Sequence, residues 1–278
     1  MGKSSKDKRD IFYRLAKEQG WRARSAFKLL EIDDEFHVLK GVKRVVDLCA
    51  APGSWSQPSQ SPPKIVAVDL QTMARKFKRY LNIGDITKQS TVEQILGYFE
   101  GEFADIVVCD GAPDVIGLHD FDEYIQAQLV LAALNITTHI LRPGGTLIAK
   151  IFRGKDVTLL YARLLRFFER VTCAKPRSSR NSSIEAFVVC QNYRPPKDYI
   201  PTMTKPILDL SYDENNKLLG PSRLIVPFVA CGDASGFDSD QTYPLEEKSL
   251  DPLQPPIGAP YRTAITLKQQ NYYNKIPS

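Results

Sequence analysis

Short apolar runs alternate with longer amphipathic stretches through the first two thirds of the chain. The runs are rich in β-branched residues and predict buried strands. They span residues 45–49, 65–70, 106–109, 146–152 and 185–190. The stretches around them repeat apolar residues at helical spacing. These predict helices over residues 21–36, 91–99, 122–141 and 156–171. The alternation predicts an α/β fold, in which helices cover both faces of a mostly parallel sheet.

The first predicted strand lies in the segment RVVDLCAAPGSW, residues 44–55, and leads into a loop of small residues. Ala, Gly and Ser have small side chains, so a ligand could approach the backbone of this loop closely. In open parallel sheets, ligands bind outside the carboxyl ends of the strands, where this loop would lie. The alternative is a tight connection without a ligand. No G-x-G-x-x-G follows the strand, which counts against a nucleotide-dependent dehydrogenase.

The connection over residues 57–64, QPSQSPPK, fits this fold poorly. A link between two parallel strands normally contains a helix. Three prolines in eight residues disfavour a helix here. Either the crossover is a short extended link, or a helix has been lost at this point.

Composition and charge limit the class of protein. With 278 residues, 43% of them hydrophobic, the chain can form one large domain, or one domain with an extension. The net charge of +5 suits a polyanionic partner without requiring one. The five cysteines have no C-x-x-C or other metal-ligand spacing, so they predict reduced core residues in a cytoplasmic protein and no metal site. No apolar run is long enough to span a membrane.

Two segments flank the alternating region. Residues 1–20 are basic and carry interspersed aromatics, which predicts either a frayed terminus or an arm that closes on a phosphate backbone. Residues 194–278 are rich in proline and turn residues, which predicts a partly irregular extension that docks on a partner. The expected division is therefore a main domain over residues 1–193, with the basic segment at its start, and a C-terminal extension over residues 194–278.

Polar residues follow several of the predicted strands, at the edge of the sheet where ligands bind. An aspartate after a strand more often caps a turn than binds a ligand, but here such residues recur at successive strand ends. Lys150 interrupts an apolar strand, and a lysine is rarely buried without a partner. If the last strand runs antiparallel to the others, Glu185 begins beside Lys150 and Asp110. The candidate residues are Asp69, Asp85, Asp110, Lys150 and Glu185.

Five segments together resemble the FtsJ/RrmJ family of S-adenosylmethionine-dependent RNA ribose 2′-O-methyltransferases. They are SKDKRDIFYRLAKEQGWRARSAFKLLEI, VVDLCAAPGSWSQ, VVCDGAPDVIGLHDFDEY, GGTLIAKIFRG and KPRSSRNSSIEAFVVC, which cover residues 4–193 in the family's order. In the extension, FVACGDASGFDSDQTYPL and PPIGAPY are similar to the eukaryotic cytoplasmic branch that acts on the tRNA anticodon loop. The resemblance implies a Rossmann-like methyltransferase fold with one antiparallel strand, and methyl transfer to the ribose 2′-hydroxyls of positions 32 and 34.

The resemblance also implies roles for individual residues. The family's catalytic Lys-Asp-Lys-Glu set falls on Lys28, Asp110, Lys150 and Glu185, and all four residue types match. Its S-adenosylmethionine contacts fall on Gly53, Trp55, Asp69, Asp85 and Asp110. The proline-rich link departs from the family pattern and puts in doubt how firmly the loop around Gly53 is held.

Lys150 is the candidate general base, with Asp110 orienting it and with Lys28 and Glu185 orienting the nucleotide. Neighbouring carboxylates favour the charged ammonium, whereas a base must be neutral. Burial and the cofactor's sulfonium would therefore have to lower the pKa of Lys150. The residue pattern leaves open which effect is larger.

RNA is expected to be held by the N-terminal arm and by the loop KPRSSR, residues 175–180, with Phe12, Tyr13 and Trp21 available to stack on unpaired bases. The resemblance implies two partner subunits that select the nucleotide. One is a WD-repeat protein for the wobble position, and the other is a large helical-repeat protein for the first anticodon-loop nucleotide. The alternatives are an rRNA methyltransferase of the same family and a non-catalytic RNA-binding subunit with a degenerate fold.

Overall fold

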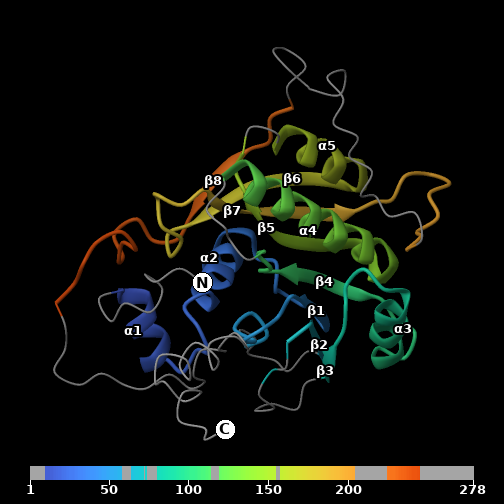
Figure 1. Ribbon diagram of the computed structural model, residues 1–278, viewed down its shortest axis with the longest axis horizontal. Coiled ribbons are helices and arrows are strands. Elements are labelled where there is room, and N and C mark those ends of the chain that lie inside the picture. Colours follow the sequence, from blue (N-terminus) through green and yellow to red (C-terminus); the bar gives the residue numbers. More distant parts are fainter. Residues whose placement is uncertain are drawn as a thin grey trace, which may run out of the picture.

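The fold is an α/β sandwich around one central sheet (Figure 1). The computed structural model describes residues 10–57, 64–71, 73, 80–113, 119–154, 157–203 and 224–244. The helices are α1 (Ile11–Glu18), α2 (Ala26–Phe36), α3 (Gln89–Tyr98), α4 (His119–Ile140) and α5 (Val157–Phe167). The strands are β1 (Arg44–Leu48), β2 (Lys64–Asp69), β3 (Tyr80–Ile83), β4 (Ala104–Cys109), β5 (Leu141–Phe152), β6 (Phe168–Pro176), β7 (Glu185–Tyr193) and β8 (Phe228–Cys231).

The described strands form an eight-stranded sheet in the order β3-β2-β1-β4-β5-β7-β6-β8. Strands β3, β2, β1, β4 and β5 are parallel to one another, and β7 is antiparallel to both β5 and β6. The mostly parallel sheet with one antiparallel strand is therefore confirmed. Because β7 runs against β5, Glu185 pairs with Phe152 at the carboxyl end of β5.

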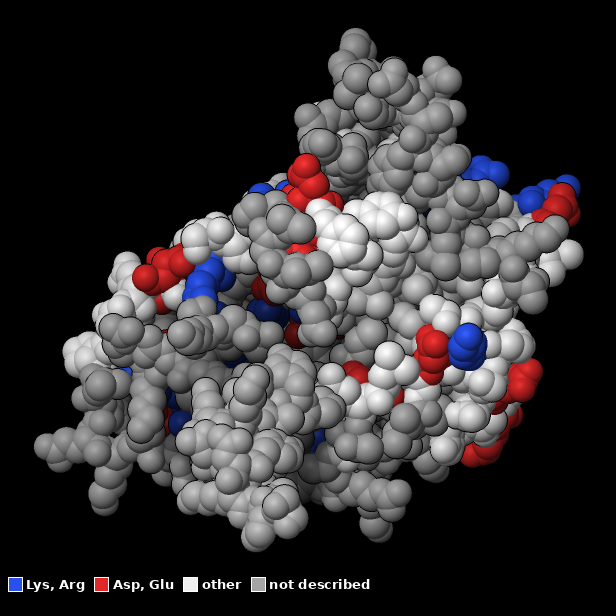
Figure 2. Space-filling model, viewed as in Figure 1, with Lys and Arg blue, Asp and Glu red and all other residues white. Residues whose placement is uncertain are grey.

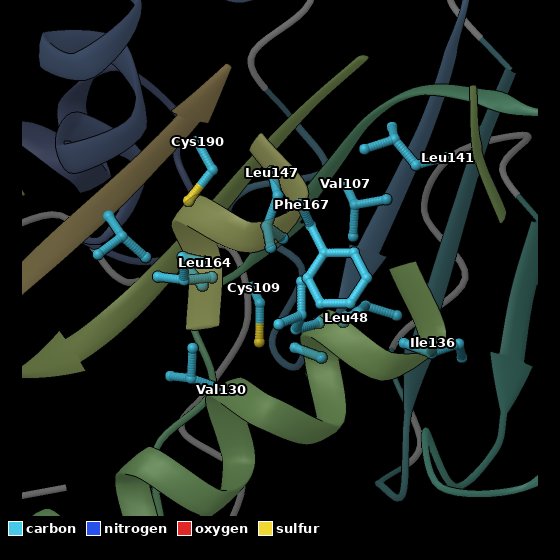
Figure 3. Close-up of a cluster of buried hydrophobic side chains, with 14 of the residues drawn as sticks. Leu48, Val107, Cys109, Val130, Ile136, Leu141, Leu147, Leu164, Phe167 and Cys190 are labelled. Carbon is cyan, nitrogen blue, oxygen red and sulfur yellow. The ribbon is translucent and has the colours of Figure 1, made fainter. Parts of the chain in front are cut away.

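Alternate residues of the strands are buried on opposite faces of the sheet. Val107 and Cys109 of β4 pack with α3, α4 and α5 on one face, whereas Ile106 and Val108 pack with α2 on the other. A strand covered on both sides needs apolar residues at every position, which explains the unbroken apolar runs in the sequence. Figure 3 shows the first of these clusters, in which Val107 and Leu147 lie near Leu164 and Phe167 of α5.

Two predicted helices differ from the observed ones. Helix α2 begins at Ala26 and not at residue 21, and α5 ends at Phe167, so Phe168 and Val171 belong to β6. Strand β6 pairs with both β7 and β8, so its backbone hydrogen bonds are satisfied between strands. The sequence also failed to predict β3 and β8, each of which has only four residues.

The C-terminal extension joins the main sheet in its described part. Strand β8 is parallel to β6, and its register pairs Cys173 with Phe228 and Pro176 with Cys231. Residues 224–244 are therefore part of the same layer structure as residues 10–193. The docking role predicted for residues 194–278 stays a prediction, and residues 204–223 and 245–278 lie outside the described residues, as does the proline-rich stretch at 58–63.

The cysteines are the reduced core residues that the sequence predicts. All five lie in the described part of the chain as free thiols, four of them buried and Cys49 partly so. None of the helices that the structure describes combines the length and the apolar character needed to cross a membrane.

Candidate active site

The first part of the site lies where β4 and β5 end side by side. Asp110 directly follows β4, and Lys150 is the tenth residue of β5. Their neighbours Cys109 and Ala149 pair in register, which brings the two side chains together. Lys150 Nζ lies 2.9 Å from Asp110 Oδ1 and donates a 2.6 Å hydrogen bond to the main-chain oxygen of Asp110. The Lys150 side chain is only 10% exposed, so the sequence prediction of a buried and paired lysine is confirmed.

The second part joins α2 to the start of β7. Lys28 Nζ lies 2.7 Å from Glu185 Oε1, and these side chains are 12% and 16% exposed. The ammonium group of Lys28 also lies 5.6 Å from the centre of the Phe187 ring. Ser179 Oγ donates a 2.8 Å hydrogen bond to the same carboxylate oxygen, Glu185 Oε1. The structure thus brings together Lys28, Asp110, Lys150 and Glu185 as two ion pairs.

The two ion pairs influence each other. Burial lowers the pKa of Lys150, but the carboxylates of Asp110 and Glu185 outweigh it, so the pKa is raised above its ordinary value. Burial likewise raises the pKa of Glu185, but Lys28 and Lys150 outweigh it and hold that pKa at about 2. In the chain without ligands, Lys150 is therefore a protonated ammonium. In the space-filling view, acidic and basic side chains lie next to each other in a recess near α2 (Figure 2).

Replacing Glu185 by glutamine should make the free energy of unfolding depend less on pH below about pH 4.5. A carboxylate with a folded pKa of about 2 and an ordinary value of 4.5 contributes stability that is fully present above about pH 4.5. That contribution is lost as the pH falls toward 2. We expect the wild-type chain to exceed Glu185→Gln by about 3 kcal/mol in free energy of unfolding at pH 7, and this difference to shrink steadily below pH 4.5.

Urea denaturation between pH 2 and pH 7 measures this difference. The matched control is Glu93→Gln, because Glu93 is an exposed residue of α3. A constant difference between wild type and Glu185→Gln across that range would contradict the prediction. It would mean that Lys28 and Lys150 do not lower the pKa of Glu185.

Carboxylates also gather at the ends of β2 and β3. Asp69, the last residue of β2, accepts hydrogen bonds from the main-chain N–H groups of Ala51 (2.8 Å) and Gln71 (2.7 Å). Its register partner is Ile83, which places Asp85 two residues beyond the same sheet edge. Asp85 accepts hydrogen bonds from the N–H and hydroxyl of Thr87, which lower its pKa. Asp69 thus contacts the small-residue loop after β1 directly, and Asp85 lies beyond the end of the neighbouring strand at the same edge of the sheet.

The small-residue loop is held firmly in the described part of the chain. Gly53 has φ +95°, a conformation that favours glycine, and a Cβ there would lie 2.5 Å from the guanidinium of Arg22. Arg22 Nη1 donates to the main-chain oxygen of Pro52 at 2.8 Å. Below the loop, Ser56 Oγ donates to the buried Asp47 at 2.6 Å. These contacts fix the loop even though a proline-rich link follows it.

Trp55 has a different environment from the other predicted cofactor residues. Its ring is 4% exposed and packs 5.4 Å from the ring of Phe187, and its Nε1–H donates to the main-chain oxygen of Ser25 at 2.8 Å. The indole is therefore a core group that joins the loop to α2. Its side chain is thus not available as the cofactor contact that the family resemblance implies.

The loop over residues 175–180 differs from the RNA-gripping segment that the sequence predicts. Lys175 is buried and donates hydrogen bonds to the main-chain oxygens of Ser183 (2.9 Å) and Glu185 (2.5 Å). Arg177 donates to the main-chain oxygen of Phe237 at 3.0 Å, and Arg180 pairs with Asp10 at 3.3 Å. The prediction is wrong for Lys175, because its charge points into the protein.

The aromatic residues near the N-terminus are only partly available for stacking. Phe12 is buried and packs 5.5 Å from the ring of Phe27, so its predicted stacking role is wrong. Tyr13 and Trp21 are half-buried, with Lys17 over the Tyr13 ring at 4.5 Å. Residues 1–9, the most basic part of the predicted arm, lie outside the described residues.

Two residues of the site, Gln126 and Arg22, have no counterpart in the sequence prediction, and a third, Ser179, is predicted only as part of a loop that holds RNA. Gln126 of α4 donates to the main-chain oxygens of Lys150 (2.7 Å) and Gly111 (3.1 Å), and so joins the ends of β4 and β5. Arg22 contacts the small-residue loop after β1, and Ser179 contacts Glu185, as described above. A polar residue on an apolar helix stripe could have identified Gln126, but no local pattern identifies the other two.

Comparisons with known proteins agree with this arrangement. A family model described as FtsJ-like methyltransferase matches residues 21–193. The chain is 61% identical over 288 residues to a human tRNA (cytidine(32)/guanosine(34)-2'-O)-methyltransferase, covering 99% of this chain and 88% of the relative. It is 54% identical over 286 residues to the Schizosaccharomyces pombe protein of the same name, covering 96% and 98%.

More distant relatives carry other names. An AdoMet-dependent rRNA methyltransferase of Schizosaccharomyces pombe is 40% identical over 208 residues, which cover 73% of this chain and 26% of that protein. A solved structure described as a ribosomal RNA methyltransferase from Plasmodium falciparum is 26% identical, with a TM-score of 0.57, and covers 62% of this chain and 98% of that one. The chain belongs to the FtsJ-like methyltransferase family.

Proposed function

We propose that the chain is a cytoplasmic tRNA ribose 2′-O-methyltransferase that transfers methyl groups from S-adenosylmethionine to the 2′-hydroxyls of nucleotides 32 and 34 in the anticodon loop. One observation carries the proposal. The chain matches enzymes of that name over almost its whole length. The structure supports it, since the four matching residues meet as two ion pairs at the carboxyl edge of the sheet. The rRNA enzyme is a weaker alternative, because its relative matches only 73% of this chain.

The residues present fit S-adenosylmethionine, which supplies an electrophilic methyl group when bound. Asp69 would accept the ribose hydroxyls, since its oxygens keep lone pairs beyond the two backbone N–H groups that they accept. Asp85 would accept the adenine amino group. The main chain around Gly53 and Trp55 would line the methionine end of the ligand, beside Asp110.

The catalytic residues would act on the ribose 2′-hydroxyl of the RNA. Lys28 and Glu185 would hold the nucleotide, and Lys150 would take the proton from the hydroxyl. Because the pKa of Lys150 is raised, its ammonium must first release a proton to solvent. Orienting two bound reactants supplies about 7 to 11 kcal/mol, and a positioned base adds about 10² to 10⁴-fold in rate.

Partner subunits would choose between the two nucleotides, a WD-repeat protein for position 34 and a large helical-repeat protein for position 32. The described part of the extension packs on the sheet through β8 but leaves Ile200, Ile225 and Phe237 exposed. The docking segment would lie within the extension, residues 194–278. A non-catalytic role as an RNA-binding subunit is disfavoured by the complete set of four catalytic residue types.

The test is a map of ribose methylation in RNA from cells that lack this gene. Loss of 2′-O-methylation at tRNA positions 32 and 34, restored by the wild-type chain but not by Glu185→Ala, is the expected result. Unchanged tRNA together with an unmethylated rRNA nucleotide would contradict the proposal and favour the rRNA enzyme. Unchanged methylation in both classes of RNA would favour the non-catalytic subunit.

A further inference from the structure

The loop between β6 and β7, residues 177–184, reaches the active site through one buried hydroxyl. Ser179 is 2% exposed, and its Oγ donates a 2.8 Å hydrogen bond to Glu185 Oε1. The same oxygen lies 2.7 Å from Lys28 Nζ. One carboxylate oxygen therefore receives two donors from two different elements, which fixes the rotation of the carboxylate.

Lys175 gives the Ser179 hydroxyl its direction. Lys175 Nζ lies 3.2 Å from Ser179 Oγ, and an ammonium can only donate. The hydroxyl of Ser179 must then accept from Lys175 and direct its own hydrogen toward Glu185. The same ammonium donates to the main-chain oxygens of Ser183 and Glu185, so it also joins the end of β6 to the end of the loop and to the start of β7.

Two neighbouring elements hold the outer side of the loop. Glu31 of α2 accepts hydrogen bonds from the N–H (3.0 Å) and hydroxyl (2.8 Å) of Ser178. Asp240, from the C-terminal extension, accepts from the N–H of Asn181 (2.6 Å) and the hydroxyl of Ser182 (3.3 Å). The loop is thus bound to α2 on one side and to the extension on the other.

We propose that this serine-rich loop is a positioning device for Glu185, in which Ser179 and Lys175 are the positioning residues and Asp240 is the anchor from the extension. The inference rests on the proposed function, since it assigns the loop to the catalytic glutamate. It replaces the RNA-gripping role that the basic residues of this loop suggest in the sequence.

The experiment uses the full-length chain, S-adenosylmethionine, and tRNA and extract from cells that lack this gene, so that any partner subunits are present. Ser179→Ala should lower kcat about tenfold, the usual effect of one lost hydrogen bond to a charged group. Its Kd for S-adenosylmethionine should stay at the wild-type value. The matched control is Ser235→Ala, an exposed serine outside this loop that donates to Asp233, and its kcat should stay within about twofold of wild type.

A double-mutant comparison separates positioning from a general loss of stability. In a Glu185→Gln background, Ser179→Ala should cause no further loss, because the residue acts through the carboxylate that is already gone. Lys175→Met is the second variant. It should lower kcat in the wild-type background and cause no further loss in the Glu185→Gln background. A wild-type kcat in Ser179→Ala would overturn the proposal, and so would an equal loss in both backgrounds.

A readout independent of methylation keeps the two proposals distinguishable. Removing the Ser179 hydroxyl should raise the pKa of Glu185, since that hydrogen bond is one of the interactions that lower it. Carbon-13 NMR of the labelled carboxyl groups measures this shift. Absence of tRNA methylation by the wild-type chain would contradict the proposed function, whereas an unchanged Glu185 titration in Ser179→Ala would overturn the positioning role.

Discussion

Replacing Lys150 by methionine should lower the rate of tRNA methylation by about three orders of magnitude, within the range of about 10² to 10⁴-fold that a positioned base supplies. Methionine keeps an unbranched apolar stem in the buried site and removes the ammonium. The binding of S-adenosylmethionine, measured by calorimetry, should change little because Lys150 is not among the proposed cofactor contacts. A folded, cofactor-binding Lys150→Met that methylates tRNA at the wild-type rate would exclude Lys150 as the base.

The pH profile of the wild-type chain separates a base from an orienting cation. Because the pKa of Lys150 is raised above its ordinary value, the neutral amine is a minor species at neutral pH. If the amine is the reactive form, log(kcat/KM), with both substrates far below saturation, rises with a slope of one between about pH 6 and pH 9. Lys150→Met should lose this slope. A flat wild-type profile would mean that Lys150 acts as an ammonium that orients the 2′-hydroxyl.

The parallel part of the fold could be predicted because its strands are buried on both faces. Ile106 and Val108 face one helical layer while Val107 and Cys109 face the other, so all four positions from Ile106 to Cys109 are apolar and the run stands out from its surroundings. The same reasoning identified Lys150, since a charge in such a run must have a partner. Strand β6 could not be predicted in this way. Its first residues continue the helical spacing of α5, and only its pairing with β7 and β8 decides its conformation.

The four catalytic candidates could be predicted from residue types and strand ends, together with the family resemblance. The contacts of Arg22 and Asp240 could not, because each joins segments far apart in the sequence, and the contact of Ser179 with Glu185, six positions away, depends on how the loop between them folds. Arg22 meets Pro52 across 30 positions, and Asp240 meets Asn181 across 59. A basic loop also looks the same in sequence whether its cations face solvent or the interior. Only the folded positions of its partners show that Lys175 is buried.

Replacing Asp110 by asparagine should affect both stability and the pH profile. The change removes the carboxylate nearest to Lys150 and leaves the main-chain hydrogen bond in place, so we expect a loss of about 2 kcal/mol in free energy of unfolding. It also removes the largest of the effects that raise the pKa of Lys150, so that pKa should fall and the rising limb of log(kcat/KM) should move to lower pH. In Asp110→Asn the rising limb of the pH profile is therefore shifted, whereas in Lys150→Met it is lost.

The matched control is Asp105→Asn at the other end of the same strand. Asp105 pairs with Arg142 at 2.7 Å and lies at the amino edge of β4, away from the site. That variant should lose stability without any movement of the pH profile. If Asp110→Asn leaves the limb where it is, the carboxylate does not control the protonation of Lys150. The resting ammonium would then depend on Glu185, and the orienting role of Asp110 would be wrong. If the limb moves to lower pH, the ion pair at the ends of β4 and β5 sets the fraction of neutral amine, and with it the rate at neutral pH.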